Sequence, residues 1–306
     1  MPPLLVIVGP TASGKTALSL ELARHFPLEI ISADSRLFYK GMDIGTAKPT
    51  LAEQARVPHH MIDLCQPDET VTLGAYQAQV YQLIEAIHQR QRLPVLLGGT
   101  GQYVWAIVEG WGIPRVSPHA ALRTALESLG QKELARWLQK LDPLAAATID
   151  LNNTRRTIRA LEVTLITGLP MSVHQQKHPP PYQIHLLGLT CGRETLYRRI
   201  DARVDEMITA GLVDELISLR ARGYSRHLPA MSGLGYRQLW PYLDGEYSLP
   251  EATERIKFET HRFVRQQYNW FKPDDPRIHW LNIEEEVDLT AAAAAQIQPW
   301  YTANNQ

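Results

Sequence analysis

Short apolar runs alternate with helix-like stretches over the first hundred residues. The runs Leu4–Val8, Glu29–Ser32 and Pro94–Leu97 are bounded by glycine or polar turns, as strands buried on both faces of a parallel sheet are. Between them, Thr16–His25 and Ala75–Arg90 have the spacing of amphipathic helices. This alternation predicts an α/β fold in which crossover helices connect parallel strands.

The strand pattern stops near Pro114 and is replaced by helical spacing. Three amphipathic helices are expected there, over Ala120–Leu129, Lys132–Leu141 and Asn153–Thr167. The proline cluster at His178–Tyr182 ends this stretch. We therefore predict a small all-helical insertion domain over residues 114–182.

The sheet is expected to resume after the insertion. Gln183–Leu189 has the pattern of another buried strand, and two long helices are expected around Arg193–Arg222 and Pro250–Phe271. The alanine-rich stretch Ala291–Ala295 predicts a further helix. Residues 1–113 and 183–306 would then form a single core domain.

Composition adds limits to this fold. The 306 residues are 44% hydrophobic and 21% charged, which is typical of a globular protein and excludes a collagen-like chain or a coiled coil. The two cysteines, Cys65 and Cys191, are too few for a disulfide framework and have no metal-binding spacing. The first residues lack a basic segment and a long apolar run. We expect a cytoplasmic protein with no membrane partner.

Charge becomes informative when it is divided along the chain. The whole sequence has a net charge of −1, but Pro114–Tyr182 holds 9 Lys and Arg against 5 Asp and Glu. This segment therefore carries +4 and the remainder −5. A site for a polyanion could lie in the insertion, and the alternative is a set of ordinary solvated helix faces.

The first predicted strand leads directly into a phosphate-binding motif. Residues Gly9–Thr16 read GPTASGKT and match GxxxxGK[ST] between a strand and a helix. Backbone N–H groups of this loop can surround a phosphate, Lys15 can neutralise its oxygens, and the Thr16 hydroxyl can bind Mg²⁺. The motif predicts a P-loop NTPase-like core that binds a polyphosphate. Its residues are Gly9, Pro10, Thr11, Ala12, Ser13, Gly14, Lys15 and Thr16.

The usual acidic companion of this loop is missing from the third strand. Pro94–Leu97 is followed by Gly98-Gly-Thr-Gly101, which offers no carboxylate. Asp34, after the second strand, is the acidic candidate, because open α/β sheets collect functional groups beyond the carboxyl ends of their strands. The alternative for Asp34 is a helix cap or turn, and for Thr100 a tight strand-to-helix turn.

Several further motifs give the sequence a family resemblance. They include Asp34-Ser35, Tyr39–Pro49 (YKGMDIGTAKP), Pro58-His-His60, GGTG with Tyr103, Arg155-Arg156, Arg159-Ala-Leu-Glu162 and Gly235-Tyr-Arg-Gln238. Together with GPTASGKT, in this order, they resemble bacterial tRNA dimethylallyltransferases from about residue 4 to residue 272. That family moves a dimethylallyl group from its diphosphate to N6 of adenosine 37 in tRNA.

The resemblance implies roles for residues of the core. Gly9–Thr16 with Mg²⁺ at Thr16 would hold the diphosphate, and Arg203 would bind the same group. Asp34 would accept a hydrogen bond or proton from the N6 amine, and Thr100 would contact the target base. The implied catalytic residues are thus Asp34, Thr100, Lys15 and Arg203.

The resemblance also implies where tRNA is held. A stacked base must be swung out to reach the phosphate loop, so its neighbours need contacts of their own. The implied contacts are Asp34, Ser35, Arg36, Leu37, Thr100, Arg123, Arg155, Arg156, Thr157, Ile158, Arg159, Gly233, Leu234, Gly235, Tyr236, Arg237 and Gln238. We expect a monomer with tRNA and dimethylallyl diphosphate as its partners.

Two departures and three other functions remain open. Leu37 stands where many family members have glutamine, and Arg265–Phe271 has one basic residue fewer than the usual KRQLTWF. The alternatives are prenyl transfer to free adenine nucleotides, a small-molecule kinase, and a non-catalytic RNA-binding module. The insertion and Gly235–Gln238 disfavour the first, GGTG disfavours the second, and the phosphate loop disfavours the third.

Overall fold

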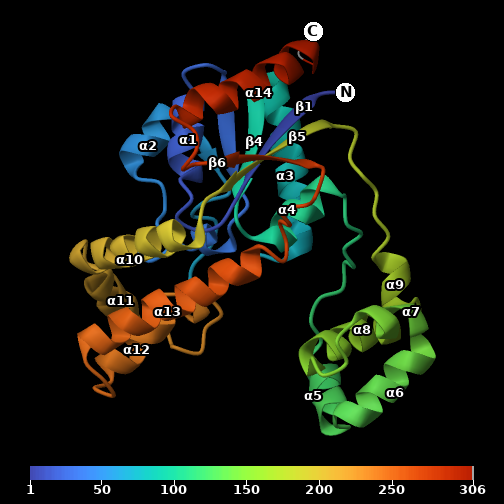
Figure 1. Ribbon diagram of the computed structural model, residues 1–306. Coiled ribbons are helices and arrows are strands. Elements are labelled where there is room, and N and C mark those ends of the chain that lie inside the picture. Colours follow the sequence, from blue (N-terminus) through green and yellow to red (C-terminus); the bar gives the residue numbers. More distant parts are fainter. Residues whose placement is uncertain (305–306) are drawn as a thin grey trace. The chain divides into compact units, whose positions relative to one another are not determined.

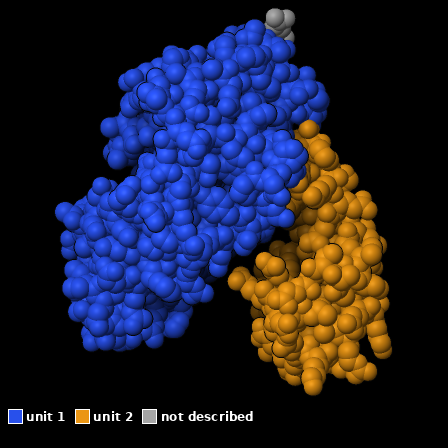
Figure 2. Space-filling view, viewed as in Figure 1, with its two compact units in different colours: residues 1–105, 181–306 blue, residues 106–180 orange. Residues whose placement is uncertain are grey.

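The computed structural model describes residues 1–304, and the chain divides into two compact units. One unit combines residues 1–105 with the chain from Pro181 onwards, and the other is Ala106–Pro180 (Figure 2). The boundaries drawn from the sequence, 1–113 and 183–306 against 114–182, concern domains that fold separately and stay a prediction.

Six strands of the described chain form one all-parallel sheet in the first unit, in the order β3-β2-β4-β1-β5-β6. Figure 1 labels β1, β4, β5 and β6 of this sheet. They are β1 (Pro3–Val8), β2 (Leu28–Ser32), β3 (His59–His60), β4 (Leu93–Gly98), β5 (Gln183–Thr190) and β6 (Ile278–Asn282). Each of the four predicted strands lies within an observed one. The predicted α/β class with a parallel, P-loop NTPase-like sheet is confirmed.

The sequence pattern missed the two outermost strands. β3 has only two residues, too few for any periodicity to show. β6 reads IHWLN and is buried only at Ile278 and Leu281, so it lacks the continuous apolar run of the central strands. Edge strands are covered on fewer sides, and their sequences are correspondingly more polar.

The helices of the first unit connect the strands and extend beyond the sheet. They are α1 (Lys15–Leu22), η1 (Ser35–Phe38), α2 (Leu51–Arg56), α3 (Leu73–Gln89), α4 (Gly101–Val108), which runs into the second unit, α10 (Arg193–Thr209), α11 (Leu212–Ala221), η2 (Ala230–Ser232), α12 (Tyr236–Leu243), α13 (Leu249–Gln267) and α14 (Leu289–Asn304). The helix predicted at Ala291–Ala295 is the middle of α14. One prediction was wrong, because Arg193–Arg222 is two helices. Gly211 has a φ of 101°, which a right-handed helix cannot contain, so α10 ends and α11 begins there.

The sheet places three chain segments next to each other. Val8 at the end of β1 pairs with Gly98 of β4, and Ser32 of β2 pairs with Leu97. All residues of β1, β2 and β4 are buried, and side chains from α1 and α14 complete the core on one face. The residues that follow β1, β2 and β4 therefore lie side by side, just beyond the carboxyl ends of these strands.

The second unit is helical throughout its regular structure. Its helices are α5 (Ala120–Ser128), α6 (Gln131–Leu141), α7 (Pro143–Thr148), α8 (Thr154–Thr167) and α9 (Met171–His174). The three predicted helices are α5, α6 and α8. A separate apolar core, which includes Leu134, Leu138, Ile158 and Leu161, holds them together.

No helix among residues 1–304 has the length and apolar character that crossing a membrane requires.

Candidate functional site

The phosphate loop lies between β1 and α1, as the motif requires. Gly9 and Gly14 have positive φ angles of 149° and 92°, and Gly14 directly precedes α1. Lys15 Nζ donates to the carbonyl oxygens of Gly9 and Pro10, at 2.9 and 2.8 Å. The lysine therefore folds back over its own loop, with its charge next to the concave surface of N–H groups that an anion would fill.

Two buried cations meet at this loop, and Asp34 is an anion close to both. Burial and the nearby Arg203 guanidinium lower the pKa of Lys15 to about 7, and Asp34 opposes part of this change. Burial also lowers the pKa of Arg203, a residue of α10. A polyphosphate would reverse both effects, because its negative charge favours the protonated lysine and arginine. The electrostatics thus fit an anion at the position where the motif predicts one.

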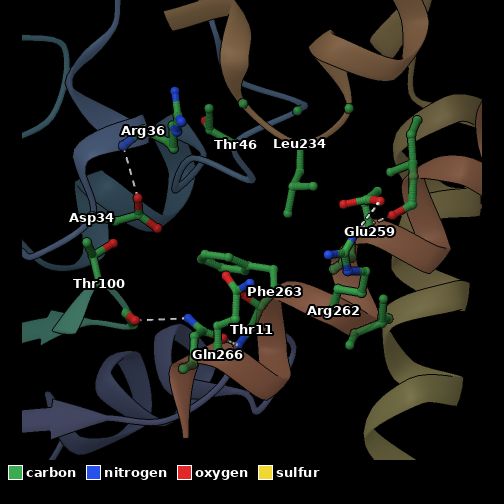
Figure 3. Close-up of a pocket in the computed structure, with 18 of the residues that line it drawn as sticks. Thr11, Asp34, Arg36, Thr46, Thr100, Leu234, Glu259, Arg262, Phe263 and Gln266 are labelled. Atoms are coloured by element: carbon green, nitrogen blue, oxygen red, sulfur yellow. Dashed lines mark hydrogen bonds and ion pairs between the residues drawn. The ribbon is translucent and has the colours of Figure 1, made fainter. Parts of the chain in front are cut away.

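Asp34 follows β2 and borders a pocket of about 640 Å³ whose lining comes wholly from the first unit. Its Oδ1 atom accepts a hydrogen bond from the N–H of Arg36 at 3.0 Å and so caps η1. Oδ2 accepts no hydrogen bond from residues 1–304, and Figure 3 shows the carboxylate at the edge of the pocket. The two interpretations of Asp34, as a cap and as a functional carboxylate, are therefore compatible.

The GGTG segment after β4 needs its glycines because other chain segments press on it. A Cβ atom on Gly101 would lie 2.2 Å from the Trp270 side chain, and one on Gly98 2.5 Å from the Ala33 carbonyl oxygen. Thr100 lies between them and lines the same pocket as Asp34 (Figure 3). The segment thus acts both as a tight turn and as a pocket wall, and it carries no carboxylate.

A buried glutamine that the sequence analysis did not single out joins two of these segments. Gln267, 5% exposed at the end of α13, accepts from the N–H of Thr11 at 2.9 Å. Its Nε2 donates to the Gly99 carbonyl oxygen at 2.9 Å. This one side chain therefore fixes the position of the phosphate loop relative to the GGTG segment.

The segment Gly233–Gln238 forms another wall of the pocket. Gly233, Leu234, Gly235, Tyr236 and Arg237 line it, together with Ser35 and Arg36. Arg36 also holds this wall in place, because its guanidinium donates to the Pro229 and Ala230 carbonyl oxygens and to Ser232 Oγ. Gln238 is buried and accepts from the Gly235 N–H at 3.0 Å, so its side chain is committed to capping α12.

Helix α13 supplies another wall, and the sequence motifs included only its end, from Arg265 onwards. Glu259, Arg262, Phe263 and Gln266 line the pocket. Glu259 and Arg262 lie across from Asp34 and Thr100, and Phe263 and Gln266 lie between the two sides (Figure 3). Phe263 is 37% exposed, although it is a large apolar side chain. Phe263 thus gives the pocket an apolar face, whereas the sequence shows only a long amphipathic helix there.

Most of the predicted core residues come together, and a few do not line the pocket. Thr11, Asp34, Ser35, Arg36, Thr100, Arg203 and Gly233–Arg237 share it. The rest of the phosphate loop, which is Gly9, Pro10, Ala12, Ser13, Gly14, Lys15 and Thr16, lies outside its lining, as do Leu37 and Gln238. The phosphate loop is nevertheless next to the pocket. Thr11 belongs to the loop and to the pocket lining, and the charges of Asp34 and Arg203 shift the pKa of Lys15.

The remaining candidates belong to the second unit. Arg123 and Arg159 both pair with Glu162, a fully buried carboxylate on α8. Although burial alone would raise it, hydrogen bonds from Arg123, the His119 N–H and Arg159 hold the pKa of Glu162 at about 2. This pair of arginines is thus built into the helical unit by charge-assisted bonds.

Arg155 and Arg156 differ from the other candidates on α8. Both are exposed, and no ion pair joins either to a described residue. Thr157 and Ile158, by contrast, are 1% and 4% exposed and contribute their side chains to the interior. Of the predicted segment 155–159, the two leading arginines are the side chains most available to a polyanion.

A divalent cation would find few protein ligands at the loop. No group of three or more His, Cys, Asp or Glu side chains within residues 1–304 could hold a metal ion. Mg²⁺ bound with a polyphosphate takes most of its ligands from phosphate and water, so one hydroxyl such as Thr16, at the start of α1, fits that chemistry.

Comparison with known proteins adds a consistent set of matches. The sequence profile described as IPP transferase matches residues 37–274. A tRNA dimethylallyltransferase from Roseiflexus sp. (strain RS-1) is 50% identical over 99% of this chain and 100% of its own length. One from Dehalococcoides mccartyi is 49% identical over 94% of this chain and 89% of its own length.

Solved structures agree with the sequence matches. The tRNA isopentenylpyrophosphate transferase of Bacillus halodurans is 37% identical and aligns over 100% of this chain and 97% of its own, with a TM-score of 0.73. A eukaryotic dimethylallyltransferase acting on tRNA is 26% identical and aligns over 100% of this chain and 80% of its own, with a TM-score of 0.87.

Proposed function

The chain belongs to the IPP transferase family, and on that premise we propose that it transfers the dimethylallyl group of dimethylallyl diphosphate to N6 of adenosine 37 in tRNA. The products are N6-(dimethylallyl)adenosine and diphosphate. The observation that carries the proposal is the pocket that joins Asp34 and Thr100 to Arg203, next to an intact phosphate loop and without a strand-end carboxylate.

In the proposed reaction the phosphate loop holds the leaving group. Loop N–H groups, Lys15 and Arg203 bind the diphosphate, on which negative charge grows as the allylic C–O bond breaks. Mg²⁺ held at Thr16 would neutralise part of that charge. Because no γ-phosphoryl group moves, the metal-binding aspartate of the NTPases is not needed after β4.

The acceptor amine enters from the pocket. The N6 lone pair is delocalised into the purine, so the amine is a weak nucleophile. Asp34 Oδ2 is free to accept its N–H, which strengthens the nucleophile as the C–N bond forms and takes up the proton that is lost. Thr100 lies beside Asp34 and can hold the base in place.

The apolar part of the pocket suits the prenyl chain. Ile200, Val204 and Met207 of α10 line the pocket on either side of Arg203 in the sequence. A five-carbon chain extending from a diphosphate at Arg203 would contact these side chains and be shielded from water.

tRNA binding is assigned to residues of both units. We assign Ser35–Leu37 and Gly233–Gln238 to the anticodon loop around the target base. We assign the arginines of α5 and α8, chiefly Arg155 and Arg156, to its phosphates. We further propose a monomeric, cytoplasmic enzyme, because every group assigned to the reaction comes from one chain and tRNA is found in the cytoplasm.

Transfer of a labelled allylic group tests the proposal. The protein is incubated with Mg²⁺, labelled dimethylallyl diphosphate and either unmodified tRNA or AMP. We expect label in tRNA and none in AMP. Label in AMP alone would favour the free-nucleotide enzyme, and ATP turnover to ADP without allylic transfer would favour a kinase.

A further inference from the structure

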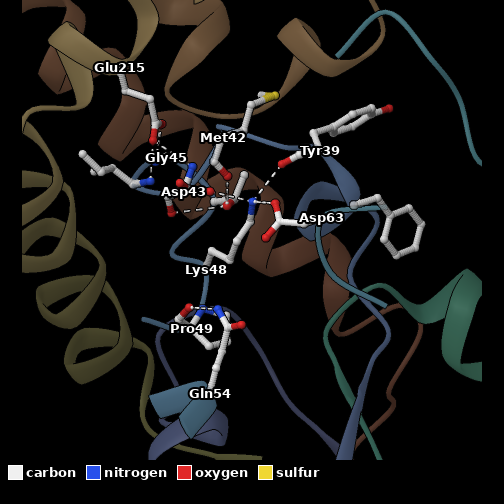
Figure 4. Close-up of polar contacts among 12 residues, drawn as sticks. Tyr39, Met42, Asp43, Gly45, Lys48, Pro49, Gln54, Asp63 and Glu215 are labelled. Carbon is white, nitrogen blue, oxygen red and sulfur yellow. Dashed lines mark hydrogen bonds and ion pairs between the residues drawn. The ribbon is translucent and has the colours of Figure 1, made fainter. Parts of the chain in front are cut away.

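The motif YKGMDIGTAKP, Tyr39–Pro49, forms a loop held from outside by one carboxylate. Glu215, in the first turn of α11, accepts hydrogen bonds from three successive backbone N–H groups (Figure 4). Oε2 takes those of Asp43 and Ile44 at 2.7 and 2.8 Å, and Oε1 takes that of Gly45 at 3.1 Å. Consecutive N–H groups that converge in this way form an anion-binding hollow, and Glu215 fills it.

The same carboxylate reaches a second wall of the pocket. Tyr236 Oη donates to Glu215 Oε1 at 2.6 Å, and burial and this carboxylate raise the pKa of Tyr236. A Cβ atom on Gly45 would lie 2.6 Å from the Tyr236 ring. Glu215 therefore joins the loop to the start of α12, and the two pack too closely to move independently.

The other end of the loop is held by Lys48. Its side chain is 3% exposed, and Nζ donates to the Tyr39 carbonyl oxygen at 2.8 Å and to Asp43 Oδ1 at 2.6 Å (Figure 4). It also pairs with Asp63 Oδ1. Between the two anchors, Thr46 Oγ1 donates to the Met42 carbonyl oxygen at 2.6 Å. The loop thus has one conformation set by several partners.

This loop separates two cavities. Gly45 and Thr46 line the pocket that contains Asp34, whereas Asp43, Ile44, Ala47 and Lys48 line a neighbouring cavity of about 520 Å³. Arg203 and Met207 line both. A shift of the loop would therefore change the shape of the pocket beside the residue assigned to the diphosphate.

We propose that Glu215 is a positioning residue for prenyl transfer, an inference that rests on the proposed function. It holds the Asp43–Gly45 N–H groups and the Tyr236 hydroxyl, and so sets the wall against which the acceptor base is presented to Asp34. Glu215 lines neither of the two cavities, and its carboxylate bonds to the protein itself, so it would act through the loop and Tyr236.

The chemistry of the contact explains why a carboxylate is needed. An ionised carboxylate only accepts hydrogen bonds and can take four from two oxygens, which is the number observed here. A glutamine has the same shape, but its NH₂ group would face N–H donors in place of one oxygen. Glu215→Gln therefore tests the hydrogen bonds without opening a cavity.

The experiment is a single-turnover transfer assay, with the enzyme in excess over tRNA and concentrated enough to bind all of it. We expect Glu215→Gln to lower the rate constant about tenfold or more, the scale of lost charge-assisted hydrogen bonds. The affinity for dimethylallyl diphosphate with Mg²⁺ should stay within about twofold, because the hydrogen bonds of Glu215 go to Asp43–Gly45 and Tyr236 and not to the phosphate loop. The rate constant is measured with all tRNA bound, so a change in tRNA affinity through Tyr236 does not enter it. The control is Asp214→Asn, which removes an exposed charge from the same helical turn and should leave the rate unchanged.

Tyr236→Phe provides an independent variant. It keeps the ring and removes the hydroxyl that donates to Glu215, so we expect a smaller loss of the rate constant. The losses of the two single variants should not multiply in the double variant, because both break one network. If Glu215→Gln does not fold, the rate constant of Tyr236→Phe decides the question.

The outcomes separate a positioning role from other causes. A rate constant unchanged in Glu215→Gln, or lowered equally in Asp214→Asn, would overturn the inference. A loss confined to the fraction of active enzyme would show a purely structural role, because a single-turnover rate constant does not depend on that fraction. If the wild-type protein transfers no label at all, the proposed function itself fails.

Discussion

Asp34 uses its two carboxylate oxygens for different tasks. Oδ1 caps η1 through the Arg36 N–H, and this bond also orients Oδ2 toward the pocket. A residue that caps a helix is easily dismissed as structural. Here the cap also holds the carboxylate in place, as the catalytic role that we propose for Asp34 requires.

The first prediction concerns this carboxylate. Asparagine in Asp34→Asn can still accept the Arg36 N–H, so the fold and the tRNA affinity should change little. The single-turnover rate constant should fall about 10²-fold or more, because the amide cannot take up the N6 proton. A rate constant near the wild-type value would reject the role, and a loss confined to tRNA affinity would make Asp34 a positioning residue.

The second prediction concerns Lys15, whose lowered pKa couples diphosphate binding to pH. With a pKa of about 7, Lys15 is largely neutral at pH 8 in the free protein. An anion favours the charged lysine, so the protein takes up a proton when the diphosphate binds. Affinity for dimethylallyl diphosphate should therefore fall as pH rises from 7 to 9, by up to about tenfold per unit. Calorimetry in buffers of different ionisation enthalpy should detect the proton uptake.

Lys15→Arg is the matched control for this measurement. An arginine stays charged throughout this range, so the additional pH dependence should disappear while the dependence due to the ligand's own ionisation remains. Equal pH dependence in both proteins would contradict the assignment of the proton to Lys15.

At the scale of elements, α8 carries arginines of two kinds. Arg159 is tied to the buried Glu162, whereas Arg155 and Arg156 point from the first turn into solvent. The sequence alone could place all three near tRNA by resemblance. It could not show this difference, because the partner of an arginine depends on how α5 and α8 pack.

The third prediction follows from that difference. Arg155→Ala combined with Arg156→Ala should weaken tRNA binding and make its salt dependence shallower by about one to two units of slope. Stability and binding of the allylic diphosphate should not change. Titrations of tRNA at several salt concentrations give the measurement. An unchanged affinity and slope would mean that these arginines are simply a solvated helix face.

The fourth prediction concerns the break between α10 and α11. Gly211 has a φ of 101°, and a Cβ atom there would meet nothing closer than 3.6 Å. Gly211→Ala should therefore cost about 1–2 kcal/mol of unfolding free energy from backbone strain alone. Urea unfolding measures it, with Ala210→Gly as the control at a residue of right-handed conformation, where only the smaller entropic cost of a glycine, at most about 1 kcal/mol, is expected. An equal loss in the two variants would contradict the explanation.

The sequence predicted whether a segment is a helix or a strand better than it predicted where the element ends or what it contacts. The central strands β1, β2, β4 and β5 have continuous apolar runs, so the parallel core follows from the sequence. The break at Gly211 and the edge strand β6 depend on one backbone angle and on incomplete burial, which periodicity does not record.

At the scale of the whole molecule, the motifs predicted the Asp34 and Thr100 side of the pocket better than the α13 side. Asp34, Thr100 and Arg203 were singled out by motif or resemblance, and the sheet register brings their segments together. The motif Arg265–Phe271 was noticed, but Gln267 and the rest of the α13 wall were given no role, because their roles arise from contacts with segments far away in the sequence. Glu215 was missed for the same reason.

The net charge also differs between the helical segment, which we assign to tRNA phosphates, and the rest of the chain. Pro114–Tyr182 carries +4 while the remainder carries −5. In the proposed function, the positive helical segment attracts tRNA, and the pocket in the sheet unit receives one of its bases beside the diphosphate of the second substrate.

The most direct test of the account is to identify the modified nucleoside. An unmodified tRNA transcript is incubated with the protein, Mg²⁺ and dimethylallyl diphosphate, then digested and analysed by mass spectrometry, beside a transcript with guanosine at position 37 and beside the Asp34→Asn protein. We expect N6-(dimethylallyl)adenosine from position 37 of the first reaction, none from the guanosine transcript, and far less with Asp34→Asn. An allylic group at another position, or an equal yield from the guanosine transcript, would contradict the account.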